Sequence, residues 1–221
     1  MSPIPVHLQL LAFFYGSMVL GTVLVMWLGR VPPAQAGWRV GGWRMALHGV
    51  GWGGLLALTG IAWLRYLLHS GRYLPIAITP STWDWLVLVL LAPVIQEVFF
   101  RGAILGGLRR TWHPFWATVL SAALFTVYLP MQLWLAFAFL TGIGYAMAFW
   151  LSGSVLAPML ANAAVTAALL YARQHPDFAN HMTLQTLGKV ASVFLVCILL
   201  GLIPKGGKRV GGQTQEYNIK Y

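Results

Sequence analysis

The feature that most constrains the fold is a series of apolar stretches with almost no charge, spaced along the chain. A helix of about 20 apolar residues crosses roughly 30 Å of hydrocarbon. The stretches are Leu8–Leu28, Met45–Leu64, Trp85–Gly107, Phe115–Leu129, Met131–Leu151, Val155–Ala172 and Leu187–Ile203. Leu8–Leu28 has no basic leading segment, so we interpret it as a span and not as a signal peptide. The sequence predicts an all-α fold, a polytopic membrane bundle of about seven transmembrane helices.

Composition supports a membrane location and suggests the partners. With 59% hydrophobic and only 8% charged residues, the chain has too little polar surface for a soluble globule of 221 residues. The formal net charge is +10. In a protein with several spans, such a charge favours anionic lipid headgroups over nucleic acid. We therefore expect membrane lipids and other transmembrane proteins as partners, and no nucleic acid.

The basic residues also predict the orientation. One side of the predicted bundle holds nine of them: Arg30, Arg39, Arg44, Arg109, Arg110, Lys205, Lys208, Arg209 and Lys220. The other side holds Arg65, Arg72, Arg173 and Lys189. The positive-inside rule then places the C-terminus in the cytoplasm and the N-terminus outside, in a bacterial-type cytoplasmic (inner) membrane. We predict a membrane domain at 1–204 with its core at about 84–172, and a polar basic tail at 205–221.

The third span carries charge within the stretch "LAPVIQEVFFRGAI". Glu97 and Arg101 are four residues apart, so their side chains lie on one helical face and can pair. Charged groups at bilayer depth usually face the protein interior and have a function. Two interpretations remain open, a polar pair that only joins helices and a remnant of an active site. Gln96 lies about 100 degrees round the helix from Glu97 and faces either a neighbouring helix or a cavity.

Other polar residues in the spans suggest a pocket but no metal site. Asn162 and Thr166 are also four apart, and they can complete a polar pocket with the third span. His and Cys do not cluster at metal-ligand spacing, so we expect no metal. His48 in "MALHGVGWGG" has small neighbours that would let a tetrapyrrole approach its imidazole. A helix-packing role is the alternative for His48, and we otherwise expect no cofactor.

Three segments resemble, in order and spacing, the motifs of the CPBP family of intramembrane endopeptidases. This family includes type II CAAX prenyl proteases and bacteriocin-processing proteins. The segments are "QEVFFRG" (96–102), "SAALFTVYL" (121–129) and "GSVLAPMLANAAVT" (153–166). The family motifs are Glu-Glu-x-x-x-Arg, Phe-x-x-x-His, and His-x-x-x-Asn or Asp after a Gly-Ser-x-x-Ala-Pro stretch. The resemblance implies a CPBP-type core of membrane helices around a cavity that opens within the bilayer.

The residues implied to do the chemistry differ from the family pattern. Glu97, Arg101 and Phe125 match, but the family's general base, the first Glu, is Gln96 here. A carboxamide cannot accept a proton from water at neutral pH, and such a base is worth about 10²- to 10⁴-fold in rate. The His of the second motif corresponds to Leu129. The third motif has Asn162 and Thr166 in place of His and Asn or Asp.

These departures predict a catalytically degenerate CPBP-like protein. We expect a non-catalytic interaction or assembly subunit of a membrane complex, and the small faces at 54–60 and 57–62 suit close helix contact. The alternative is an active glutamate-dependent intramembrane endopeptidase that cleaves lipidated or membrane-embedded peptides. In that case its site would be built from Glu97, Gln96, Arg101, Asn162 and Thr166. A transporter is disfavoured, because the spans show no convincing internal repeat.

Overall fold

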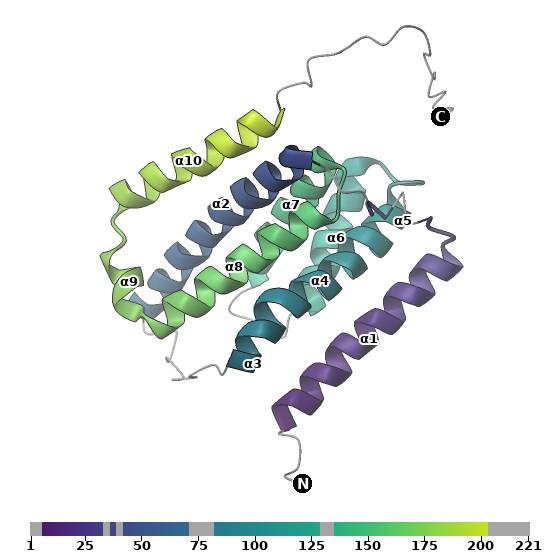
Figure 1. Ribbon diagram of the computed structural model, residues 1–221, viewed down its shortest axis with the longest axis horizontal. Coiled ribbons are helices and arrows are strands. Elements are labelled where there is room, and N and C mark those ends of the chain that lie inside the picture. Colours follow the sequence, from purple (N-terminus) through teal and green to yellow (C-terminus); the bar gives the residue numbers. More distant parts are fainter. Residues whose placement is uncertain (1–5, 33–35, 39–41, 71–81, 129–134, 203–221) are drawn as a thin grey trace, which may run out of the picture.

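The computed structural model describes residues 6–32, 36–38, 42–70, 82–128 and 135–202 (Figure 1). All regular elements in these residues are helices. Each predicted span corresponds to a helix. The helices are α1 (Val6–Leu28), α2 (Gly42–His69), a composite third helix, α6 (Pro114–Tyr128), α7 (Leu135–Ser152), α8 (Leu156–Gln174) and α10 (Leu184–Leu202). Leu129, the predicted start of the fifth span at Met131, and the predicted end of the seventh at Ile203 lie outside the described residues.

Length and composition qualify most of these helices as membrane spans. Within the described residues, five are long and apolar enough to cross a bilayer: Gly42–His69, Leu86–Leu108, Leu135–Ser152, Leu156–Gln174 and Gln185–Leu202. Ala12–Leu28 and Pro114–Tyr128 are apolar but shorter. The protein is therefore an integral membrane protein with an all-helical bundle, as the sequence predicts.

The third helix runs without a break from Thr82 to Leu108 but changes its winding. It consists of α3 (Thr82–Trp85), the π-helix η1 (Leu86–Leu91), α4 (Ala92–Glu97), the π-helix η2 (Val98–Leu105) and α5 (Gly106–Leu108). The first π-helix precedes Pro93, which has no N–H to donate and whose ring clashes with the carbonyl four residues earlier in an α-helix. Wider turns of this kind often occur at functional sites. The second begins directly after Glu97 and includes Arg101.

The helices pack around α2 and α8, which lie against each other (Figure 1). The third helix packs on α8, and α1 packs on the third helix. On the opposite edge of the bundle, α10 packs on α2, so α1 and α10 form the two outer borders. The short helix α9 (Pro176–His181), which the sequence analysis did not predict, joins α8 to α10. The polar residues of the third helix are thus enclosed by neighbouring helices.

Glycines of α2 allow the closest helix contacts. A Cβ atom at Gly53 would lie 2.8 Å from the Cα of Ala161 on α8. A Cβ atom at Gly51 would lie 2.6 Å from Cγ1 of Ile198 and 3.0 Å from the carbonyl oxygen of Phe194, both on α10. No larger side chain fits without displacing backbone, which explains how α8 and α10 approach opposite sides of α2 so closely.

Candidate functional site

The site begins with a fully buried ion pair inside the third helix. Glu97 ends α4 and Arg101 follows in η2, and the side chains of both are 0% exposed. Arg101 Nε lies 3.2 Å from Glu97 Oε2, and Arg101 Nη1 donates to Glu97 Oε1 at 3.4 Å. The two charges neutralise each other, which is how ionisable residues normally persist at this depth.

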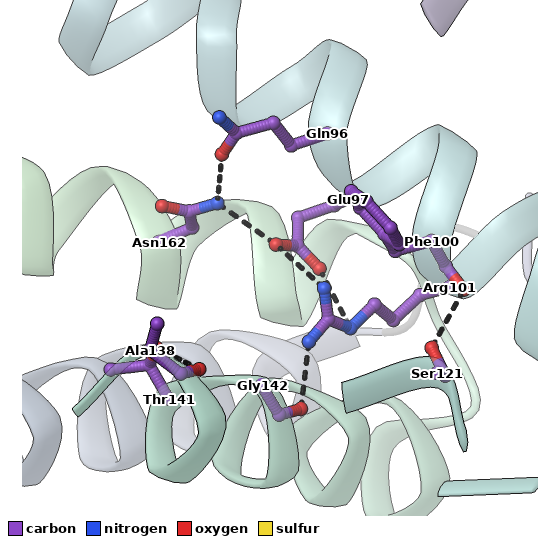
Figure 2. Close-up of polar contacts among 9 residues, drawn as sticks. All are labelled: Gln96, Glu97, Phe100, Arg101, Ser121, Ala138, Thr141, Gly142 and Asn162. Carbon is purple, nitrogen blue, oxygen red and sulfur yellow. Dashed lines mark hydrogen bonds and ion pairs between the residues drawn. The ribbon is translucent and has the colours of Figure 1, made fainter. Parts of the chain in front are cut away.

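Arg101 also joins its helix to α7. Its Nη2 donates to the Gly142 carbonyl at 2.7 Å (Figure 2). The guanidinium lies over the ring of Phe125 at 4.8 Å and over that of Tyr145 at 5.3 Å, distances at which a cation is attracted to an aromatic face. A Cβ at Gly142 would lie 3.0 Å from the Cα of Ala122, so Gly142 also lets α7 approach α6 closely. Arg101 is therefore fixed by contacts with α7 as well as by its ion pair with Glu97.

Asn162 on α8 completes the cluster from the other side. Its Nδ2 donates to Glu97 Oε1 at 2.8 Å and to Gln96 Oε1 at 3.0 Å (Figure 2). Thr166, one turn further along α8, donates through Oγ1 to Asn162 Oδ1 at 3.4 Å. Gln96 faces a neighbouring helix, one of the two orientations that its sequence position allows. The side chains of Gln96 and Asn162 are in direct contact through this hydrogen bond.

The remaining partners of the cluster are aromatic and hydroxyl groups. The Tyr15 phenol of α1 lies beside the Gln96 carboxamide. Ser121 of α6 donates to the Phe100 carbonyl at 3.1 Å. Tyr128 points away to α1, where its hydroxyl donates to the Phe14 carbonyl at 3.0 Å. The cluster therefore contacts α1, α6, α7 and α8 through side chains or carbonyls.

Sequence reasoning missed the groups that hold Arg101 on α7. The Gly142 carbonyl gives no sequence signal, because every residue has one. Tyr145 lies in an apolar helix, and no sequence pattern connects it to Arg101. The contact between Asn162 and the third helix was suggested by the polar pocket that the sequence predicts. The catalytic or structural roles of these residues remain predictions.

His48 lies apart from this cluster. Its side chain is 0% exposed, and a Cβ at Gly201 of α10 would lie 2.8 Å from its Nε2. The ring has a polar contact with the Gly201 backbone, although neither ring nitrogen makes a hydrogen bond of normal geometry with a described residue. The glycines next to it, at 49 and 51, face α8 and α10. The small faces that suggested room for a tetrapyrrole are thus in contact with the protein's own helices.

The other described histidines interact away from Gln96 and Glu97. His69 Nδ1 donates to the Arg65 carbonyl at 2.9 Å. His113 Nδ1 accepts from the Phe115 amide at 3.3 Å, and the His175 ring stacks near Tyr171 at 4.5 Å. In the described part of the chain, no three His, Cys, Asp or Glu side chains gather closely enough to hold a metal ion.

Residues 77–168 match the family model described as Type II CAAX prenyl endopeptidase Rce1-like. Over these residues the chain is similar to CAAX-protease-like membrane proteins, in agreement with the resemblance of its motifs to the CPBP family. The matched segment contains the third helix, α6, α7 and most of α8, and with them Gln96, Glu97, Arg101 and Asn162. No curated protein and no solved structure matches the chain.

The geometry of this CPBP-like core limits what its polar cluster can do. Glu97 is the only carboxylate of the cluster; its Oε1 accepts hydrogen bonds from Asn162 and Arg101, and its Oε2 is ion-paired with Arg101 Nε without accepting a hydrogen bond from the described residues. A general base must be within hydrogen-bond reach of the water that it deprotonates. Here the acceptor oxygen of Gln96 is bonded to Asn162, and Glu97 is fully buried and ion-paired with Arg101, although its Oε2 accepts no hydrogen bond from the described residues. The arrangement is well suited to joining the third helix, α7 and α8.

Proposed function

We propose that this CPBP-like membrane protein is catalytically degenerate and acts as a non-catalytic interaction or assembly subunit of a membrane protein complex. The observation that carries the proposal is the contact between Gln96 and Asn162. In the family pattern a glutamate base would occupy position 96, and here a carboxamide oxygen accepts a hydrogen bond from Asn162 Nδ2 at 3.0 Å. That oxygen has no useful basicity at neutral pH.

The burial of Glu97 and its ion pair with Arg101 also support a non-catalytic role. An active site would need this carboxylate to exchange its partners for water and substrate. In a site without water, separating Glu97 from Arg101 would leave two unpaired buried charges, at a cost of several kcal/mol. The second candidate for a base, the histidine of the family's second motif, is replaced by Leu129. Activity would therefore require both a rearranged ion pair and a base from elsewhere.

We base the proposed interaction role on the fact that the helical bundle is preserved although the motif residues differ. The small faces at 54–60 and 57–62, which suit helix contact, are used inside the bundle. Gly54 faces Phe194 of α10, and Gly60 faces Phe137 of α7 and Leu169 of α8. A partner would accordingly meet the outer helices of the bundle. We place the protein in a bacterial-type cytoplasmic membrane with its C-terminus inside, from the nine-to-four division of basic residues.

The test compares cleavage by the purified protein with cleavage by two variants. The substrates are a prenylated peptide ending in a CAAX sequence and a single-span peptide, each with the protein in molar excess in mild detergent. We expect the wild type to cleave no faster than Glu97→Gln, and Lys189→Gln, which changes an exposed residue of α10, to behave identically. Cleavage that is retained in Lys189→Gln and lost in Glu97→Gln would make the protein an intramembrane endopeptidase and end the proposal.

The assembly role needs its own measurement. The protein is isolated from its native membrane in mild detergent, and its mass is determined together with that of any bound chain. A subunit should retain partner chains at a fixed stoichiometry through two different detergents. Recovery of the chain alone in both detergents would contradict the assembly role, whatever the result for cleavage.

A further inference from the structure

A second polar site lies at the C-terminal end of α2, away from the Glu97 cluster. A pocket of about 500 Å³ opens between the last two turns of α2 and the beginning of α10. It is lined by Ala62, Arg65, Tyr66, His69, Thr183 and Leu187. Tyr66 and Thr183 carry hydroxyl groups that can donate to an anion in addition to Arg65, and Ala62 and Leu187 are apolar. The lining therefore combines a positive group with a hydrocarbon wall.

Arg65 provides the fixed positive charge of this pocket. Its side chain is half-buried, and its Nη1 donates to the Met182 carbonyl in the turn between α9 and α10. That bond holds the guanidinium at the wall of the pocket, so less conformational freedom is lost when a ligand binds. A guanidinium has five N–H donors in a planar fork that matches the oxygens of a phosphate. One contact with a carbonyl leaves this fork able to bind an anion.

The charges around the pocket favour a ligand with net negative charge. None of the described lining residues is acidic. Asp177 on α9 is exposed, and it is not part of the lining. His69 donates its Nδ1–H to the backbone carbonyl of Arg65, which fixes its ring in the wall of the pocket. A zwitterionic headgroup would find no carboxylate for its ammonium, whereas an anionic headgroup needs none.

The position of the pocket indicates that the anion belongs to a lipid. The pocket lies at the ends of two spans, where headgroups meet the hydrocarbon. Tyr66 is 52% exposed and its ring lies 5.6 Å from that of Trp63, an aromatic pair of the kind found at membrane interfaces. Ala62 and Leu187 extend the wall toward the hydrophobic interior. A free phosphate would make no use of these two residues, while an acyl chain would cover them.

We propose that this pocket binds one anionic phospholipid, with the phosphate on Arg65 and an acyl chain along Ala62 and Leu187. Basic pockets between transmembrane helices are known to hold anionic headgroups. This site is independent of the proposed function, since it shares no residue with the Glu97 cluster.

The test titrates the purified full chain with phosphatidylglycerol and with phosphatidylcholine of the same acyl chains, and counts bound lipids by native mass spectrometry. We expect one phosphatidylglycerol to bind about tenfold or more tightly than phosphatidylcholine. Arg65→Gln should lower that affinity about tenfold, as expected for a lost charge-assisted hydrogen bond. Lys189→Gln, a change at an exposed cation of α10 outside the lining, should leave it unchanged.

A second variant tests the pocket without touching Arg65. Ala62→Leu adds volume to the apolar wall, so it should weaken phosphatidylglycerol binding while the melting temperature stays near that of the wild type. Three results would overturn the proposal: equal affinity for the two lipids, equal losses in Arg65→Gln and Lys189→Gln, or displacement of the lipid by millimolar inorganic phosphate. The last result would identify a small-anion site.

Discussion

The interface between the third helix and α8 and the interface between α2 and α10 hold helices together by different means. In the first, Glu97, Arg101 and Asn162 are buried and bonded to one another. In the second, Gly51 allows backbone contact, and the buried His48 imidazole lies against the Gly201 backbone of α10 without a hydrogen bond of normal geometry to a described residue. Removing a partner should therefore be far more harmful in the first interface. In the second interface, adding a side chain at a glycine should destabilise the protein more than replacing the His48 imidazole by an apolar group.

Loss of Arg101 should have the largest effect. Arg101→Leu leaves the Glu97 carboxylate buried without its cation, which should lower the free energy of unfolding by about 3–5 kcal/mol. The measurement is unfolding by SDS titration in mixed micelles. Lys189→Leu, at an exposed cation, serves as the control and should show no comparable loss. Equal effects of the two changes would mean that the ion pair does not hold the helices.

The glycine contact in the second interface should tolerate no side chain. Gly51→Ala places a methyl group 2.6 Å from Ile198 Cγ1 and 3.0 Å from the Phe194 carbonyl, so it should destabilise the protein by about 1–3 kcal/mol through overpacking. Gly188→Ala is the matched control, because no atom lies within 4 Å of a Cβ at that position. It should leave stability unchanged or raise it by about 0.5–1 kcal/mol through helix propensity. A neutral Gly51→Ala would indicate that α10 is not packed on α2 as described.

Asn162 should matter less than Arg101, because it is neutral. Asn162→Leu removes the donor to both Gln96 Oε1 and Glu97 Oε1, and we expect a loss of about 1–2 kcal/mol in the same titration. Thr166→Val removes only the 3.4 Å contact with Asn162 Oδ1 and should change stability by less than about 0.5 kcal/mol. A larger effect at Thr166 than at Asn162 would reverse the order of importance that the distances imply.

His48 should show the smallest response to a loss of polarity. His48→Leu keeps the volume approximately and removes an imidazole whose contact with the Gly201 backbone is not a hydrogen bond of normal geometry, so the free energy of unfolding should stay within about 1 kcal/mol of the wild type. The loss should be smaller than that of Asn162→Leu. A larger loss would show that the contact between His48 and Gly201 stabilises the interface between α2 and α10.

Much of the fold follows from the sequence because the bilayer restricts the choice. Seven apolar stretches with little charge predict seven helices, five of which are long enough to cross a bilayer, since a spanning segment must satisfy its backbone hydrogen bonds internally. The π-helices of the third span were not predictable, because the hydrophobic pattern of "LVLVLL" suits an α-helix equally well. Nor was α9, a helix of six residues between two spans.

The candidate site was predictable only where its contacts are local. The four-residue spacing of Glu97 and Arg101 indicates their pairing, and the same spacing indicates the contact between Asn162 and Thr166. The bond from Arg101 to the Gly142 carbonyl depends on how α7 crosses the third helix, which no local pattern encodes. The direct bond between Gln96 and Asn162 likewise depends on how α8 packs on the third helix.

A double-mutant cycle tests most directly whether Glu97 and Arg101 hold the bundle together. The free energy of unfolding is measured for the wild type, Glu97→Leu, Arg101→Leu and the double variant by the same SDS titration. Each single change strands a buried charge, so we expect the double variant to be more stable than either single variant, with a coupling of at least about 2 kcal/mol. Losses that add within about 0.5 kcal/mol would show that the two residues do not stabilise the bundle as a pair.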